Sequence, residues 1–496
     1  MLSREITQEI EYPPTLPPML DTVDLDSLQQ RRLPFVHLEA QIVRAVMAEP
    51  NVLSPEEIGW LRYIVSLARC VWIRSANGQD IHVEPLLSRF RWFVKHQFAP
   101  ILERRFPVVG LRQILPMVLQ ETKRMREVLL ERTELDALSL QEEVCNRQLL
   151  LALGGGGGSG FGYAGVMRAL HHAGIPIQMI AGTSIGSLIA MFRARTRIFD
   201  QLPMLEAVRS LNWSSVLRVL DIENRYGVPA TLRLYLRSSL DELLQSKNGR
   251  SMRFSDCEIP LLIVATGLTV DAFKHDLSFY EHLMDDAFVD SPRLFRQSSV
   301  RRIVKMTSTL YEFLSNPNAL REVVFGADEL TANADVIDAA GFSSAVTGLL
   351  HYDVLRDDPR MTQILDKMYG KFGITRLTEG GLVNNVPVKP LLHEVFRGRI
   401  KRRNPFVLAL DCFSPQLTSM WYPVQKMIVP NVQANIKHAD QYFSLRRRLS
   451  PINVVPTVDQ ALKAIDWTAQ ELQPHLPFII RMCAQHGDIP YERVSI

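Results

Sequence analysis

Five consecutive glycines, Gly154–Gly158, are the feature of this sequence that most restricts its fold. They follow an apolar run, Leu149–Leu153, that has the length of one buried strand, and they lead toward a helical pattern over Ala164–His172. A glycine-rich turn between a strand and a helix exposes bare backbone N–H groups at the positive end of the helix, where negative charge is stabilised. The segment therefore predicts a backbone site for negative charge.

A second motif, Gly182-Thr183-Ser184-Ile185-Gly186, follows a second predicted strand, Ile177–Ala181, and begins a helical pattern over Ile185–Arg197. Gly-x-Ser-x-Gly between a strand and a helix is the pattern of a nucleophile elbow, in which a strained turn holds the serine hydroxyl out. A nucleophilic serine and a turn of bare backbone donors are the two components that acyl transfer requires. Together the motifs predict acyl transfer.

The glycine-rich turn is also compatible with a nucleotide-binding protein, but such a protein requires further sequence features. A dinucleotide-binding fold requires an acidic residue roughly 20 positions after the glycines, and no Asp or Glu occurs between Gly154 and Phe199. A phosphate-binding P-loop requires a lysine beside the glycines, and none is present there. The missing partners favour acyl transfer over nucleotide binding.

The composition of the chain narrows the classes of protein to which it can belong. The chain has 496 residues, of which 47% are hydrophobic and 22% charged, which is typical of a globular protein of two or three domains. A net charge of +3 is small for this length and argues against a dedicated nucleic-acid binder. The five cysteines form no CxxC pair, so we expect reduced thiols rather than a zinc site or a disulfide framework.

The sequence shows no membrane-spanning or secretory signal. No apolar run approaches the roughly 20 residues that a transmembrane helix needs. Residues 1–24 lack the basic and apolar regions of a signal peptide, and we expect an extended or disordered leader over residues 1 to about 30. These features predict a cytoplasmic protein or one that is peripheral to a membrane.

Patterns along the chain predict helical regions on both sides of an α/β domain. Ser54–Glu57 is typical of a helix start, and a second long helix is expected over about Leu111–Leu138, with Pro116 as a kink or a later start. From about residue 148 apolar runs alternate with helical patterns, and Leu261–Ala265 and Phe406–Leu410 have strand length. Such alternation predicts a mainly parallel sheet covered by helices on both faces.

Three motifs in this order resemble the patatin-like phospholipase family. Gly155–Gly160 matches its oxyanion turn and continues into a similar helix, Gly182–Gly186 matches its elbow, and Glu379–Val388 matches its second catalytic block with an Asn-x-Pro tail. Phe342–Ala345 takes the place of a small-residue segment upstream of that block. The resemblance covers residues 148–413 and implies a three-layer α/β domain with a mainly parallel sheet of patatin type. It leaves a mostly helical region over 1–147 and a helical extension over 414–496.

The resemblance implies a lipid acyl hydrolase, of phospholipase or lysophospholipase type, that uses no cofactor and no metal. Ser184 would be the nucleophile and Glu379 its base, with no histidine between them, and a lipid acyl ester would be the substrate. The oxyanion hole would consist of the backbone N–H groups of Gly155, Gly156 and Gly157. The motif glycines that would support these turns are Gly158, Gly160, Gly182, Gly186, Gly380 and Gly381.

Two residues depart from the family pattern at the site itself. Glu379 stands where the family has aspartate, and its extra methylene must be absorbed if proton transfer is to occur over about 2.6–3.2 Å. Ser159 stands where the family usually has a basic residue. The alternative interpretation is therefore a catalytically degenerate domain that acts as a lipid- or partner-binding scaffold.

Three further features have both a functional and an ordinary structural interpretation. Phe90–Phe98 mixes aromatic and basic residues, as interfacial helices do, but is also typical of a buried aromatic face. The basic residues of Arg397–Arg403 could form an anionic-lipid patch or a solvated loop. His171 and His172 lie on the helix after the glycine turn, away from the elbow, so we expect surface or core-edge positions rather than a catalytic role.

Overall fold

The computed structural model describes residues 24–212, 217–219, 225–228, 230–246, 248–272, 317–354, 358–417, 419 and 421–490. The chain divides into two compact units, which we describe separately. The first contains Met1–Gln148, Leu392–Pro405 and Arg481–Ile496, and the second contains Leu149–Leu391 and Phe406–Ile480. Most of the expected leader lies outside the described residues, but the first helix already begins at Leu25.

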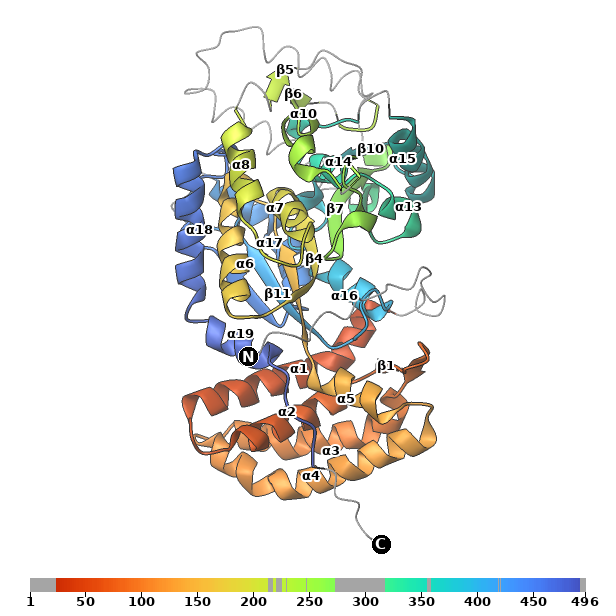
Figure 1. The fold of residues 1–496 in the computed structure, drawn as a ribbon, viewed down its shortest axis with the longest axis vertical. Helices are drawn as coiled ribbons and strands as arrows, with labels where there is room; N and C mark the ends of the chain where they lie inside the picture. The colour runs from red at the N-terminus through yellow and green to blue at the C-terminus, as the bar shows by residue number, and fades with distance from the viewer. Residues whose placement is uncertain are drawn as a thin grey trace. The chain divides into compact units, whose positions relative to one another are not determined.

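The first unit is built mainly from helices (Figure 1). The expected helix start at Ser54 is confirmed: the Ser54 hydroxyl accepts from the Glu57 N–H at 3.2 Å, and the Glu57 carboxylate accepts from the Ser54 N–H at 2.8 Å. The expected long helix runs from Pro107 to Arg132, earlier at both ends than predicted, and contains Pro116. The elements are α1 (Leu25–Ala48), α2 (Pro55–Arg69), β1 (Trp72–Arg74), β2 (Asp80–His82), α3 (Glu84–Leu102), α4 (Pro107–Arg132) and α5 (Ala137–Cys145).

The aromatic–basic stretch on α3 is mainly a buried aromatic face. Phe90 and Phe98 are buried in the helical core of the unit, together with Val94. On the opposite side Trp92 is 62% exposed and stacks on His96. The helix therefore contributes its aromatic residues chiefly to packing.

The prediction that Arg397–Arg403 forms an exposed basic segment is wrong for two of its residues, because they are buried in ion pairs of the first unit. Arg402 pairs with Glu142, and Arg403 pairs with Asp80 at 2.6 Å. Both arginines are less than 10% exposed. Buried charges of this kind are tolerated only when they are paired, so these two residues serve the fold.

A buried carboxylate lies at the centre of the first unit. Glu39 is fully buried and accepts hydrogen bonds from Arg69, from Arg62 at 3.1 Å and from Arg147 at 3.2 Å. Burial alone would raise the pKa of this carboxyl, but Arg69, Arg147 and Arg62 together hold it well below the usual range. Glu39 is therefore the counter-ion of three arginines that have little access to water.

Replacing Glu39 by glutamine should destabilise the first unit strongly. The Glu39→Gln variant leaves three buried guanidinium groups without their shared anion, and breaking a buried pair in this way costs about 3–5 kcal/mol. The free energy of unfolding in guanidinium chloride measures the loss. Glu131→Gln, at an exposed position on α4, is the control and should change stability by no more than about 0.5 kcal/mol. Equal stability of the two variants would contradict this account.

The second unit is organised around a sheet with strand order β10-β7-β4-β3-β11-β12, in which β8 also pairs with β7. Neighbours β3 and β4, β4 and β7, and β11 and β12 are parallel, whereas β8 and β10 run antiparallel to β7. A second sheet has the order β5-β6-β9. The strands are β3 (Gln148–Leu153), β4 (Ile177–Thr183), β5 (Leu217–Val219), β6 (Ala230–Leu234), β7 (Leu261–Leu268), β8 (Leu320–Phe325), β9 (Gly348–His351), β10 (Arg376–Thr378), β11 (Pro405–Asp411) and β12 (Gln441–Ser444).

The expected α/β fold with a mainly parallel sheet is confirmed. The apolar runs predicted as strands form β3, β4, β7 and β11, and β7 and β11 are buried along their whole length, as strands covered on both faces are. The helices are α6 (Tyr163–His172), α7 (Ile185–Ala194), α8 (Leu202–Ser210), α10 (Arg237–Leu240), α13 (Glu329–Ala332), α14 (Val336–Ser343), α15 (Pro359–Phe372), α16 (Val388–Phe396), α17 (Tyr422–Ile436), α18 (Val458–Leu472) and α19 (Leu476–Cys483). The 3₁₀ turns are η2 (Gly157–Gly162), η3 (Asp241–Leu244), η4 (Phe254–Asp256), η5 (Val270–Ala272), η6 (Pro317–Ala319) and η7 (Gly380–Leu382).

The expected helical extension after residue 413 is not a separate region. Strand β12 joins the main sheet beside β11, and α18 packs along α6, as the blue and yellow helices in Figure 1 show. Residues 406–480 consequently belong to the same unit as the glycine turn and the elbow. None of the described helices combines the length and apolar character that crossing a membrane requires.

Candidate active site

Ser184 lies in a strained turn directly after β4, before the first residue of α7. Its backbone has φ 53° and ψ −128°, and among the described residues only Asn51 is another non-glycine with positive φ. The turn is held on both sides: the Ser184 N–H donates to the Ser343 hydroxyl at 2.8 Å, and the Ser187 hydroxyl donates to the Ser184 carbonyl at 2.6 Å. Strain that the surroundings maintain in this way is typical of a nucleophile elbow.

Strand β7 brings Glu379 to Ser184. One edge of β7 pairs with β8, so β4 and β10 must share the other edge. On that shared edge β4 ends with Thr183 opposite Val264, and β10 ends with Thr378 opposite Thr266. The two strands run toward each other along β7, and their ends lie opposite β7 residues that are two positions apart. The residues that follow the two strands therefore meet.

The side chains of Ser184 and Glu379 are neighbours, close enough for the Ser184 hydroxyl to lower the pKa of the Glu379 carboxyl. Burial raises the pKa of the Glu379 carboxyl to about 7, and the Ser184 hydroxyl opposes part of that rise. The backbone of Glu379 is fixed as well, since its N–H donates to the Ala345 carbonyl at 3.0 Å and its carbonyl accepts from the Thr266 hydroxyl at 2.6 Å. A carboxylate in this position, with a pKa near neutrality, is suited to accept the serine proton.

The glycine turn begins beside the elbow, because Leu153 at the end of β3 pairs with Gly182. One of the three expected oxyanion donors is already engaged: the Gly155 N–H donates to the Asn385 carbonyl at 3.1 Å. The N–H groups of Gly156 and Gly157 have no acceptor among the described residues. Within the described residues these two backbone donors, and not that of Gly155, are the candidates for binding a substrate oxygen.

The motif glycines allow backbone segments to approach closely. Gly157 has φ +56°, and a Cβ there would lie 2.1 Å from the Pro451 carbonyl oxygen, so only glycine fits without movement of the backbone. A Cβ on Gly380 would lie 2.1 Å from the carbonyl oxygen of Val264 on β7. At Gly158, Gly160, Gly182, Gly186 and Gly381 the nearest atom to an added Cβ would be 2.2, 2.5, 2.6, 2.2 and 2.9 Å away.

Ser159, which stands where a basic residue was expected, has a structural contact. Its side chain is fully buried, and its hydroxyl donates to the Leu449 carbonyl at 2.9 Å. The same C-terminal segment holds the glycine turn through a bond from the Gly158 N–H to the Pro451 carbonyl at 2.9 Å. Ser159 therefore ties the turn to the C-terminal segment.

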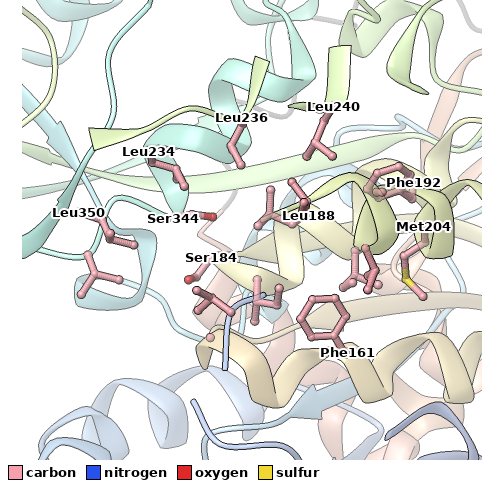
Figure 2. Close-up of a pocket in the computed structure, with 18 residues that line it drawn as sticks. Phe161, Ser184, Leu188, Phe192, Met204, Leu234, Leu236, Leu240, Ser344 and Leu350 are labelled. Carbon is pink, nitrogen blue, oxygen red and sulfur yellow. The ribbon is translucent and has the colours of Figure 1, made fainter. Parts of the chain in front are cut away.

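An apolar pocket opens onto Ser184 (Figure 2). Ser184 and Ser344 are the only polar side chains among the described residues that line it. The pattern analysis missed this pocket, because its walls come from α7, α8, α10, β6 and β9, and their apolar residues carry no signal that separates a binding wall from a core. The other lining residues are Gly157, Phe161, Ile185, Leu188, Ile189, Phe192, Met204, Ala207, Val208, Leu211, Leu234, Leu236, Leu240, Val346, Leu350 and Val454.

The remaining candidate residues lie outside this pocket. His171 and His172 are exposed in the last turn of α6, which confirms the expected surface position. In the described part of the chain no three histidine, cysteine or carboxylate side chains gather closely enough to hold a metal ion. The groups that the structure brings together at the pocket are thus a serine, a carboxylate, backbone donors and a second hydroxyl.

Comparison with known proteins agrees with this geometry. Residues 151–392 match the model of the family described as patatin-like phospholipase. The chain is 36% identical over 144 residues to proteins named lysophospholipase nte1 from Neosartorya fischeri and Aspergillus fumigatus, which is 27% of this chain and 9% of each relative. The protein of that name from Aspergillus oryzae is 48% identical over 65 residues, which is 13% of this chain and 4% of the relative.

These matches span less than a tenth of the length of those fungal relatives. The family match includes the glycine turn after β3, the elbow after β4 and the Glu379 block after β10. Residues 151–392 of this chain therefore form a patatin-like phospholipase domain.

Proposed function

We propose that this chain is a lipid acyl hydrolase in which Ser184 attacks an ester and Glu379 accepts its proton. The observation that carries the proposal is that Ser184 and Glu379 lie next to each other directly after β4 and β10, with Ser184 lining an apolar pocket. Neither group needs a metal or a cofactor for this chemistry, because the base activates the serine and backbone donors hold the developing charge.

In the first half of the reaction the Ser184 Oγ bonds to the ester carbon while its proton passes to Glu379. The carbonyl oxygen becomes negative and is held by the N–H groups of Gly156 and Gly157. The C–O bond to the alcohol then breaks, and Glu379 gives its proton to the departing oxygen. Water repeats the sequence on the acyl-enzyme and releases the carboxylic acid.

The departures from the family pattern are compatible with catalysis in this geometry. The longer Glu379 side chain reaches Ser184 from its own fixed backbone position. Ser159 packs against the C-terminal segment, and the backbone donors of the turn do not depend on a charge at that position. These contacts favour an active enzyme over a degenerate scaffold.

The pocket supports a substrate with a long apolar group next to the ester. A wall of leucine, isoleucine, valine, methionine and phenylalanine side chains would bind a fatty acyl chain by the hydrophobic effect. Because the fungal relatives reported above are named lysophospholipases, we propose a phospholipid or lysophospholipid as the substrate. A substrate of this class implies peripheral contact with lipid assemblies.

Replacing the nucleophile should abolish hydrolysis. We expect Ser184→Ala to release fatty acid from lysophosphatidylcholine at least about 1000-fold more slowly than the wild type, because the covalent route is lost. The control is Ser210→Ala, at an exposed serine at the end of α8 outside the pocket, which should keep the wild-type rate. Equal rates for wild type and Ser184→Ala would contradict the proposal.

Activity should rise with pH through about 7. Glu379 must be ionised to accept the serine proton, and burial raises its pKa to about 7. At pH 6 only about a tenth of the enzyme would hold the ionised base, so kcat/KM for a soluble ester should fall roughly tenfold from pH 8 to pH 6. A profile that is flat from pH 5.5 to 8, or that has its midpoint near the ordinary glutamate value of 4.5, would contradict this role for Glu379.

A further inference from the structure

The Ser344 hydroxyl lies in the pocket and has no hydrogen-bond partner among the described residues. Ser344 is 7% exposed, and within the described part of the chain its Oγ meets no donor or acceptor. Figure 2 shows it close to Ser184 on the left of the view, with Phe192 and Met204 on the right. A buried hydroxyl in apolar surroundings is unfavourable unless something bonds to it, so this group is free to bond to a polar atom of a bound molecule.

Ser344 stands between two residues that hold the Ser184–Glu379 pair. The preceding Ser343 accepts from the Ser184 N–H and donates to the Val264 carbonyl at 2.6 Å. The following Ala345 accepts from the Glu379 N–H. The tripeptide is thus anchored to both groups, and its middle hydroxyl has a fixed position beside them.

The sheet order places Ser344 across Ser184 from the glycine turn. Strand β4, which leads to Ser184, has β3 on one side and β7 on the other. The glycine turn follows β3, whereas Ser343 is bonded to β7. An ester carbonyl oxygen that points to Gly156 and Gly157 therefore points away from Ser344. The other ester oxygen must lie toward Glu379, because that residue delivers a proton to it.

We propose that the Ser344 hydroxyl donates a hydrogen bond to the alkoxy oxygen of the bound ester, the oxygen that leaves with the alcohol. The proposal rests on the proposed hydrolase function and adds a leaving-group residue to it. As the C–O bond breaks, the bonding electrons move to that oxygen, and a donor there stabilises the developing charge. Ser344 keeps its own proton, and the proton that the alcohol gains comes from Ser184 by way of Glu379.

Two esters with the same acyl chain test this role. The octanoyl esters of p-nitrophenol and of glycerophosphocholine differ in how strongly cleavage of their C–O bond depends on stabilisation of the leaving oxygen. The reason is that p-nitrophenoxide is a far more stable anion than a glycerol alkoxide. We expect Ser344→Ala to lower kcat/KM about tenfold or more for the glycerophosphocholine ester and to leave the p-nitrophenyl ester nearly unchanged, as loss of one hydrogen bond to a charged oxygen predicts. Ser344→Thr, which keeps the hydroxyl, should retain most of the activity on both esters.

The other possible results distinguish failure of the role proposed for Ser344 from failure of the hydrolase function. An equal loss on both esters would overturn the proposal and assign Ser344 to the oxyanion hole or to packing. No loss on either ester would overturn it as well. Val346→Ala is the control for a change in the pocket wall that removes no hydroxyl, and it should affect both esters alike. Failure of the proposed function itself would appear separately, as a wild type that hydrolyses neither ester or as wild-type activity that survives Ser184→Ala.

Discussion

The meeting of β4 and β10 on one edge of β7 is the constraint on which the site depends. β4 enters that edge as a parallel strand and β10 enters it from the opposite end as an antiparallel strand. Ser184 and Glu379, almost 200 residues apart in the sequence, are the first residues beyond the two strand ends. Hydrogen bonds from Ser184 to Ser343 and from Glu379 to Ala345 then fix both backbones to one tripeptide. The proposed nucleophile and its proposed base need no histidine between them, because the sheet itself aligns the two residues.

The motif glycines expose backbone donors, and they are also required because some of their positions have no room for a side chain. At Gly157 a side chain would collide with Pro451, and at Gly380 with Val264, so each turn depends on backbone lying directly against backbone. The segment around Pro451 lies far beyond the matched family region, yet it packs directly against the glycine turn. Residues 406–480 therefore help to build the unit that contains the proposed active site and are more than an extension of it.

Much of this arrangement was predictable from the sequence because its signals are local. The runs that form β3, β7 and β11 are apolar over five or more residues, β4 is apolar apart from Gln178 up to Ala181, and the glycine turn and the Gly-x-Ser-x-Gly motif each occupy one strand–helix junction. Strand β10 was missed because three residues are too few to show a period. The predicted roles of Ser184, Glu379 and the glycines stay proposals.

What could not be predicted depends on partners far away in the chain. In the sequence Arg402 and Arg403 resemble part of a basic surface segment, whereas in the structure they pair with Glu142 and Asp80. Gly155 resembles the other turn glycines, yet its N–H is used by Asn385, 230 residues later. Ser344 lies in a segment of small residues, and only the packed structure shows that its hydroxyl lines a pocket and has no partner in the described part of the chain. In each case long-range packing decides what a side chain or an amide does.

The most direct test of the Ser184–Glu379 pair is the rate of labelling by a fluorophosphonate probe, with the modified serine identified by peptide mass spectrometry. We predict modification at Ser184 alone, and labelling slowed at least about 100-fold in Glu379→Gln because the base is lost. Glu379→Asp should also label slowly, since the backbone bonds to Ala345 and Thr266 prevent the shorter side chain from advancing. Labelling at another serine, or at the same rate in the wild type and both variants, would contradict the account.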